Sequence, residues 1–209
     1  MKCRHCSAEL KHTFLDLGSS PPSNAYLSKD ALKEAEQYYP LKVMVCDHCW
    51  LVQTEDFVKA DIMFASDYAY FSSYSTSWLV HAKAYVEKVS SKFYLNSNSI
   101  VVEVAANDGY LLQYINDKNI PCYGIEPTHG TAEAAREKGI EVVEDFFGVD
   151  LASRLLKQGR QADLMIANNV LAHVPDINDF VKGFSILLKP NGIATFEFPH
   201  VLNLMKNNQ

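Results

Sequence analysis

The chain has 209 residues, with 19 Lys or Arg against 25 Asp or Glu, so its formal net charge is -6. This length allows one ordinary domain plus a small one. The acidic balance and the lack of a dense basic stripe argue against nucleic acid as the main partner. No apolar run reaches membrane-spanning length, and the start, MKCRHCSAEL, lacks the hydrophobic stretch of a signal peptide. We therefore expect a cytoplasmic protein with no membrane partner.

The amino-terminal part of the chain carries two C-x-x-C pairs, Cys3 with Cys6 and Cys46 with Cys49. Each pair can wrap a tight turn that points two thiolates at one ion, and four thiolates complete the tetrahedral shell that suits a structural zinc ion (Zn2+). Two disulfides or a metal-free redox dithiol are the alternatives, and a reducing compartment disfavours both. His5 and His48 are spare candidate ligands, but four thiols already suffice.

Residues 1–60 are predicted to form this zinc-binding module. The second cysteine pair lies between the apolar runs 41–45 and 50–53, which indicates a hairpin with the metal turn at its tip. We expect an irregular segment from Phe14 to Tyr26 and a short polar helix over 29–37. A module this small has little core and depends on its metal for stability.

Residues 61–94 are predicted to connect the module to the rest of the chain. The stretch 66–75 gathers tyrosines and serines, which either line a polar pocket or pack between domains. Ser75 or Ser77 is expected to cap a helix that runs to about Phe93. This helix has an apolar stripe at helical spacing, typical of core packing, formed by Trp78, Ala82, Tyr85, Val86 and Val89.

Residues 95–209 alternate between strand-like and helix-like patterns. Residues 100–104 are an apolar, β-branched run, 105–109 are small and turn-prone, and 110–115 show helical spacing. A second run, 122–125, contains Cys122 as a core residue and is followed by Glu126. A carboxylate at that place in a βαβ unit can accept both ribose hydroxyls of an adenosine.

Three more strands are predicted after this unit, over 140–143, 162–167 and 193–198. A helix over 180–188 and a turn at 190–192 precede the last of them. Short right-handed crossovers then give a Rossmann-like, doubly wound parallel sheet of order 3-2-1-4-5, an α/β fold. Ligands of such a sheet bind beyond the carboxyl ends of its strands.

The loop after the first strand helps to identify the ligand. Its sequence, AANDGY over residues 105–110, lacks the G-x-G-x-x-G of a dinucleotide fold. The looser E-x-G-x-G-x-G pattern of S-adenosyl-L-methionine-dependent methyltransferases fits better. Glu103 and Gly109 match it, while Ala105 and Asn107 stand where glycines are usual. A packed strand–turn–helix without a ligand is the alternative.

Taken together, the ordered motifs of the whole chain resemble one family, the zinc-containing sugar C-methyltransferases that act on nucleotide-linked keto-deoxysugars. The motifs are the two cysteine pairs, PPSNA (21–25), YPL (39–41), DYAY (67–70), NDG (107–109), GIEP (124–127), NNVLAHVPD (168–176) and EFPH (197–200). The resemblance implies S-adenosyl-L-methionine and zinc as cofactors and a small-molecule nucleotide-sugar as substrate. Ala105 departs from the family's glycine, which predicts a slightly narrowed cofactor loop.

The resemblance also implies roles for single residues. Tyr68 and His173 belong to the sugar pocket as acid/base or enolate-binding groups, with Tyr70 in reserve for Tyr68. His173 follows the fourth strand, which suits this role, although it could instead pack against the turn at Pro175. The cofactor-binding residues are predicted to be Glu103, Ala105, Asn107, Gly109, Glu126, Asp145, Phe146 and Asn168. Asp145 and Phe146 follow the third strand, where methyltransferases hold adenine, and the alternative is that Phe146 and Phe147 are simply core.

A complete methyltransferase sheet would add two strands after the fifth. We therefore expect this chain to be a fragment that binds cofactor, self-associates through the open edge of its last strand and turns over no sugar alone. A methyltransferase of another acceptor, or a non-catalytic module that binds zinc and S-adenosyl-L-methionine, is the alternative function. The sequence leaves the oligomeric state open.

Overall fold

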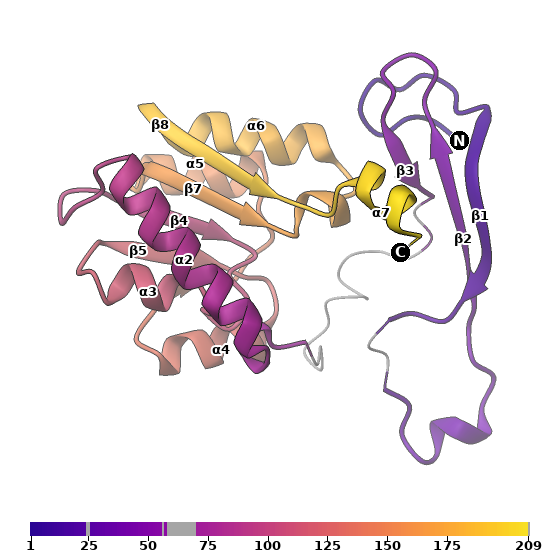
Figure 1. Ribbon diagram of the computed structural model, residues 1–209, viewed down its shortest axis with the longest axis horizontal. Helices are drawn as coiled ribbons and strands as arrows, with labels where there is room; N and C mark the ends of the chain where they lie inside the picture. The colour runs from indigo at the N-terminus through magenta and orange to yellow at the C-terminus, as the bar shows by residue number, and fades with distance from the viewer. Residues whose placement is uncertain (24–25, 56, 58–69, 209) are drawn as a thin grey trace. The chain divides into compact units, whose positions relative to one another are not determined.

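The computed structural model describes residues 1–23, 26–55, 57 and 70–208 (Figure 1). The chain divides into two compact units, Met1–Tyr70 with Pro175–Asn178, and Phe71–Val174 with Asp179–Gln209. Each unit has its own sheet and its own buried residues. The domain boundaries expected from the sequence, 60/61 and 94/95, stay a prediction.

The first unit holds an antiparallel sheet of order β1-β2-β3. Its strands are β1 (His12–Ser20), β2 (Tyr39–Val45) and β3 (Val52–Thr54). The hairpin predicted around the second cysteine pair is confirmed, because β2 and β3 flank that pair and pair with each other.

Two expectations for this unit are wrong. The segment 14–26 is not irregular throughout, because β1 runs to Ser20. Its register shifts beside Thr13 and again before Ser19, with Gly18 at φ 76°, and such bulges hide the alternation by which a strand is recognised. The helix expected over 29–37 is only the 3-10 turn η1 (Ala31–Lys33), which buries no residue and so has nothing to stabilise further turns.

The second unit contains five parallel strands in the order β6-β5-β4-β7-β8. In chain order they are β4 (Val101–Val104), β5 (Cys122–Ile125), β6 (Glu141–Val143), β7 (Ala162–Asn168) and β8 (Leu188–Glu197). The predicted order 3-2-1-4-5 is confirmed. The turn predicted at 190–192 is instead an irregularity within β8. Ala162 of β7 pairs with Leu188, but Leu164 pairs with Ile193, so the register shifts over the residues between them.

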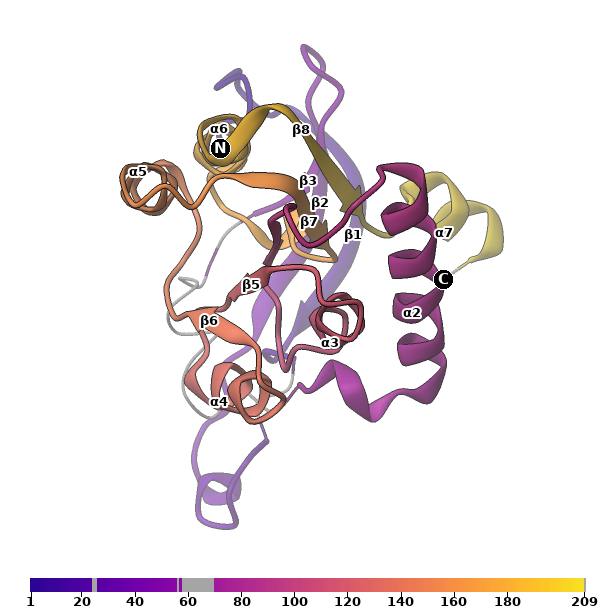
Figure 2. The same ribbon diagram turned by 90° about the vertical axis from the view of Figure 1, so that its left-hand side faces the viewer.

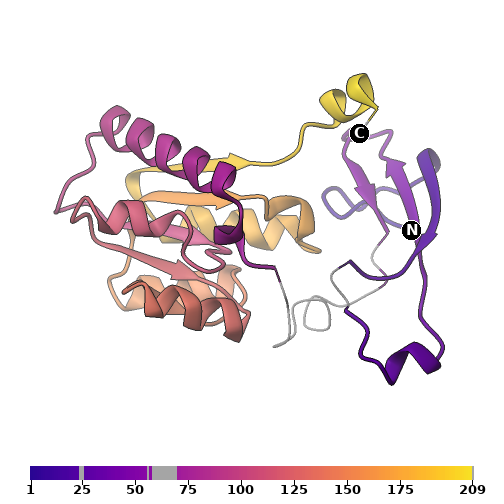
Figure 3. The same ribbon diagram turned by 60° about the horizontal axis from the view of Figure 1, so that its bottom comes forward.

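Helices cover both faces of this sheet, as Figure 2 and Figure 3 show. On one face lie α2 (Thr76–Lys92), α3 (Leu112–Asn116) and α4 (His129–Glu137), and on the other lie α5 (Val149–Lys157) and α6 (Ile177–Leu187). The predicted cap of α2 is confirmed, because Ser75 Oγ accepts a hydrogen bond from the Trp78 amide at 3.3 Å. The remaining elements are η2 (Ser72–Tyr74), η3 (Leu171–His173) and α7 (Val201–Asn207).

Strand alternation divides the core into two clusters and orients the polar residues. Val101 of β4 packs with α2, α3 and α4, whereas Val102 and Val104 pack with α5 and α6. Glu103 therefore points to the same side as Val101, toward α2 and α3. Among the described residues, no helix has the length and apolar character to cross a bilayer.

Two neighbouring leucines of α5 test this packing. Leu155 is 2% exposed against the sheet and Leu156 is 39% exposed. Leu155→Ala should lower the free energy of unfolding by about 2–5 kcal/mol, because a buried leucine leaves a cavity. Leu156→Ala is the matched control and should cost roughly 1 kcal/mol or less. Urea denaturation measures both, and equal losses would contradict the orientation of α5.

Candidate cofactor site and metal centre

The four cysteines of the first unit come together as one cluster. Their sulfur atoms all lie within 4.8 Å of one another, and the Sγ atoms of Cys3 and Cys49, and of Cys6 and Cys46, are 3.6 Å apart. Four thiolates about 2.3 Å from a tetrahedral zinc are separated by roughly these distances, whereas disulfide sulfurs would stand about 2 Å apart. All four cysteines are free thiols, so the set fits zinc and not a pair of disulfides.

Both cysteine turns have the same backbone geometry. The residue after the second cysteine is left-handed in each, Ser7 at φ 62° and Trp50 at φ 65°. The Ser7 amide donates to the Cys3 carbonyl at 2.9 Å, and the Trp50 amide donates to the Cys46 carbonyl at 3.0 Å. Two equivalent turns therefore present two thiols each. A glycine after each cysteine pair would have indicated this left-handed turn from the sequence alone. Ser7 and Trp50 occupy these positions instead, so the turn could not be predicted.

Polar groups around Cys3 favour its thiolate form, the form that binds metal. Gln53, which is buried, donates from Nε2 to Cys3 Sγ at 3.3 Å and accepts the Arg4 amide on Oε1 at 3.0 Å. Burial raises the pKa of Cys3, but backbone donors at Cys6 and His5 together with Gln53 outweigh it and bring the pKa to about 6.

The second unit builds its candidate cofactor site at the carboxyl end of β4. Within the following loop Ala105, Asn107 and Gly109 all have left-handed backbones, at φ 58°, 50° and 74°. Only Gly109 adopts this without penalty, and a Cβ there would lie 2.4 Å from Ile140 Cδ1. The narrowed loop expected from Ala105 is thus a strained one, with non-glycine residues in conformations that glycine prefers.

Glu126, at the end of β5, reaches across to this loop. Its Oε2 accepts the Asn107 amide at 2.9 Å and its Oε1 accepts the Thr128 amide at 3.0 Å. Burial raises the pKa of Glu126, and these two amide donors act against it. The hydroxyls of Thr128 and Thr131 also lower the pKa of Glu126, and the two oxygens of a carboxylate can accept about four hydrogen bonds in all. The residue thus lies where a ribose diol would find two acceptors, beside the cofactor loop.

Several buried polar atoms near the same strand ends have no hydrogen-bond partner among the described residues. They are both carboxyl oxygens of Glu103, Oδ1 of Asp108 and Oδ1 of Asn168. Burial raises the pKa of Glu103 well above its usual range, and the neighbouring Tyr110 hydroxyl offsets this only in part. Unpartnered buried polar atoms are rare in folded proteins. The Tyr110 hydroxyl lies beside both Glu103 and Asn168, and a polar ligand such as S-adenosyl-L-methionine would supply further partners at this edge.

Asp145 and Phe146 follow β6 and take different positions. Asp145 accepts its own neighbour's amide, that of Phe146, and pairs with Arg154. Phe146 is 46% exposed, whereas Phe147 packs against Phe180 and Phe184. Phe147 is therefore the core residue of the pair, and Phe146 is exposed. Their adenine-binding role stays a prediction.

Of the predicted catalytic residues, the structure describes His173 but not Tyr68. His173 is the last residue of η3, just after β7, and its side chain is exposed, while desolvation by neighbouring atoms lowers its pKa. It is therefore neutral at neutral pH and able to accept a proton. Tyr68 lies outside the described residues, and its reserve Tyr70 is exposed.

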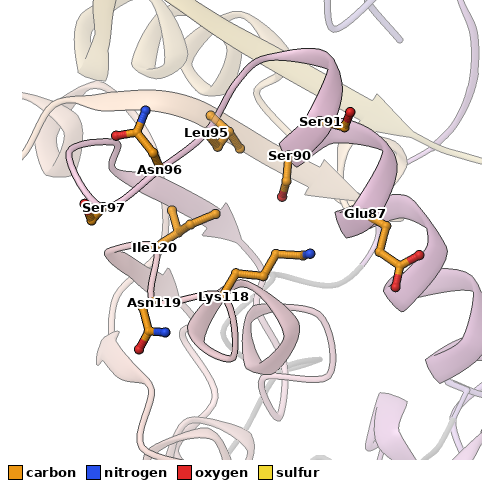
Figure 4. A pocket seen from close by; sticks show the side chains of 9 residues that line it. All are labelled: Glu87, Ser90, Ser91, Leu95, Asn96, Ser97, Lys118, Asn119 and Ile120. Carbon is orange, nitrogen blue, oxygen red and sulfur yellow. The ribbon is translucent and has the colours of Figure 1, made fainter.

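Two other features of this unit, a hollow and a cluster of charged side chains, lie outside the candidate cofactor site. A hollow of about 550 Å³ at the amino ends of the strands is lined by Ser90, Asn96 and Lys118, opposite the cofactor loop (Figure 4). The exposed side chains of His129, Glu133 and Glu144 also cluster within 4.8 Å. Arg136 pairs with both glutamates, so a cation already occupies that cluster.

Family comparison matches two separate regions. Residues 3–64 match the family described as "Putative zinc binding domain", and residues 102–194 match "Methyltransferase domain". The first region contains the four-cysteine cluster, and the second begins in β4 and ends in β8. The chain therefore joins a region similar to a zinc-binding domain with a region similar to a methyltransferase domain. Zinc and S-adenosyl-L-methionine, the two cofactors predicted from the sequence, fit these two regions.

One curated relative is similar to the whole of this chain. It is "C-methyltransferase NovU" from Streptomyces niveus, 28% identical over 208 residues. The alignment takes in 100% of this chain but 49% of that protein, so the chain spans about half the length of its relative.

Solved structures resemble the methyltransferase domain in fold. PH0226 protein from Pyrococcus horikoshii OT3 superposes with a TM-score of 0.53 at 17% identity, over 66% of this chain and 62% of its own. DesVI of Streptomyces venezuelae gives a TM-score of 0.47 at 16% identity, over 59% of this chain and 51% of its own. The first of these bears out the parallel α/β fold expected from the sequence.

The metal centre is tested by removing one thiol. Wild-type protein should hold about one zinc ion, and Cys46→Ser should lose most of it and destabilise the module, since three thiols leave the shell open. Cys122→Ser, which alters the one cysteine on β5, is the matched control and should retain its metal. Metal analysis together with melting curves measures both. A Cys46→Ser protein with full zinc would contradict the centre.

Glu103 predicts a pH dependence of stability. Its pKa is raised in the folded state, so the folded chain keeps a proton that the unfolded chain has released. This favours folding below the ordinary glutamate pKa and is lost as pH rises toward the folded value. Wild-type stability should therefore fall relative to Glu103→Gln as the pH rises from the ordinary glutamate pKa through the raised pKa of the folded state.

Denaturation curves across that range give the comparison. Glu87→Gln, which changes an exposed glutamate of α2, sets the baseline for loss of one carboxylate. Parallel curves for wild type and Glu103→Gln would show that Glu103 is not held protonated.

Proposed function

We propose that this protein is a carbon methyltransferase whose acceptor is a nucleotide-linked keto-deoxysugar. The observation that carries the proposal is the joint presence of the four-cysteine module and the cofactor loop with Glu126 in one chain. The printed name of NovU, a C-methyltransferase similar to the whole of this chain, supports carbon as the methylated atom. The family motifs of the sequence support the keto-sugar.

The chemistry of such a reaction defines what the protein's residues must do. A carbon beside a ketone becomes nucleophilic when it loses a proton, so a base must face that carbon and a donor must stabilise the enolate oxygen. S-adenosyl-L-methionine supplies an electrophilic methyl group. Glu126 would hold its ribose, and the loop from Ala105 to Gly109 would shape its binding site.

His173 is our candidate base. Its lowered pKa leaves the imidazole neutral at neutral pH, and it follows β7 at the edge where Asn168 ends the strand. Tyr68 would supply the hydroxyl that binds the enolate oxygen, with Tyr70 as the alternative. We expect His173→Ala to lower kcat far more than cofactor affinity, since general-base catalysis contributes about 10²–10⁴-fold.

Labelled S-adenosyl-L-methionine tests the substrate class. The protein is incubated with nucleotide-keto-sugars and with oxygen and nitrogen acceptors of similar size. Methylation beside the sugar ketone would support the proposal. Transfer to oxygen or nitrogen would replace it with another acceptor class, and cofactor binding without transfer to any acceptor would make the chain a binding module.

Glu126 provides the cofactor test. Glu126→Ala removes an acceptor for two charge-assisted hydrogen bonds, each about 1.5–3 kcal/mol, and should weaken binding of S-adenosylhomocysteine by about tenfold or more. Calorimetry gives the affinity, and melting curves check that the variant is folded. Glu126→Gln keeps the shape without the charge and should lie between the two. Unchanged affinity in Glu126→Ala would remove Glu126 from the site.

A further inference from the structure

The strained cofactor loop is held by Lys138, which the sequence did not single out, and by Ser72 and Ser73 of the stretch 66–75. Asn107 Oδ1 accepts the Ser72 amide at 2.8 Å, and Asp108 Oδ2 accepts the Ser73 amide at 3.2 Å. Lys138, at the end of α4, donates to the Asp108 carbonyl at 2.6 Å and to Ser73 Oγ at 2.7 Å. Its Nζ also pairs with Asp108 Oδ2 at 3.2 Å. The start of η2 and the end of α4 thus both contact the loop at Asn107 and Asp108.

Burial makes this arrangement energetically demanding. Asp108 is 3% exposed, and a buried carboxylate is costly unless an opposite charge compensates it. Lys138 is the cation that does so, since its Nζ alone forms an ion pair with Asp108 among the described residues. An apolar residue at 108 would avoid the cost, but it could not accept the Ser73 amide. The carboxylate therefore serves to fix one conformation.

That conformation is one the loop would not keep unaided. Ala105 and Asn107 are left-handed without being glycine, and such residues persist only where surrounding contacts over-determine them. Glu126 holds the Asn107 amide from one side. The contacts of Ser72, Ser73 and Lys138 hold the Asn107 and Asp108 side chains from the other.

We propose that Lys138 is a positioning residue for the cofactor site, acting through Asp108 and Ser73 to hold the loop in its ligand-binding conformation. We call these three residues the loop clamp. None of them needs to touch the cofactor. The inference rests on the proposed role of this loop in binding S-adenosyl-L-methionine.

The clamp also links two functions. Ser72 and Ser73 begin η2, two residues after Tyr70, the reserve candidate for the acceptor pocket. If cofactor binding favours the clamped loop, it also favours the bound state of Ser72 and Ser73, and the effect is reciprocal. The start of η2 should thus become more protected when the cofactor binds.

The test compares Lys138→Met with Lys118→Met in the whole chain. Both remove one lysine charge, but Lys118 is exposed in the hollow at the other end of the sheet. Calorimetry with S-adenosylhomocysteine should show affinity lowered about fivefold or more in Lys138→Met, a typical coupling between linked sites. Lys118→Met should bind as wild type does. Wild-type affinity in Lys138→Met would overturn the inference.

Hydrogen exchange gives a second readout that needs no cofactor. The Ser72 and Ser73 amides donate directly to the loop, so both should exchange faster in Lys138→Met than in wild type. If the wild-type protein binds no cofactor, the proposed function fails, while faster exchange still supports the clamp and unchanged exchange overturns it. Ser73→Ala, a milder change, should show the same direction if Lys138→Met does not fold.

A suppressor distinguishes strain from simple loss of packing. Ala105→Gly removes the penalty of the left-handed backbone at that position. In the Lys138→Met background it should restore part of the lost affinity, because the loop then needs less support. No recovery in a folded double variant would contradict the role of strain in the clamp.

Discussion

The second unit depends on a single tight turn, from β4 into α3. This turn passes close to β5 at Gly124. A Cβ atom on residue 124 would lie only 2.7 Å from Ala106 Cβ, so the close approach requires a glycine there. Three left-handed residues make the turn possible, and only Gly109 is a glycine. The strain at Ala105 and Asn107 is offset by buried polar contacts, chiefly those of Glu126 and the loop clamp. The buried carboxylate of Asp108 would destabilise the fold without Lys138. Paired with Lys138, it holds the loop that forms the proposed ligand site.

The first unit has a small hydrophobic core. Among the described residues its buried apolar cluster consists of Cys3, Leu10, Met44 and Cys46, of which the two cysteines are proposed metal ligands. Such a cluster cannot offset the entropy of ordering three strands and two turns. A zinc ion that joined the two equivalent cysteine turns would supply the missing stabilisation and fix the β2–β3 hairpin. We therefore expect the fold of this unit to depend on its metal.

Much of this could be predicted because the signals are local. Cysteine spacing located the metal centre, and apolar runs located β4, β5 and β7 with the order of the sheet. Other features escaped because their cause is distant in the chain. The bulges of β1 break its alternation, and the contacts of Lys138 with Ser73 join residues from different elements. Nothing near Lys138 in the sequence marks it, since its role exists only once α4 meets η2.

The central claim is that the edge formed by the Ala105–Gly109 loop and Glu126 binds an adenosine-containing cofactor. A crystal structure of the chain with S-adenosylhomocysteine tests it most directly. The account predicts both ribose hydroxyls within hydrogen-bond distance of the Glu126 carboxylate, about 2.5–3.0 Å, with the loop conformation unchanged. A nucleoside bound elsewhere, for example in the hollow beside Lys118, or an Asn107 amide released from Glu126 in the complex, would contradict it.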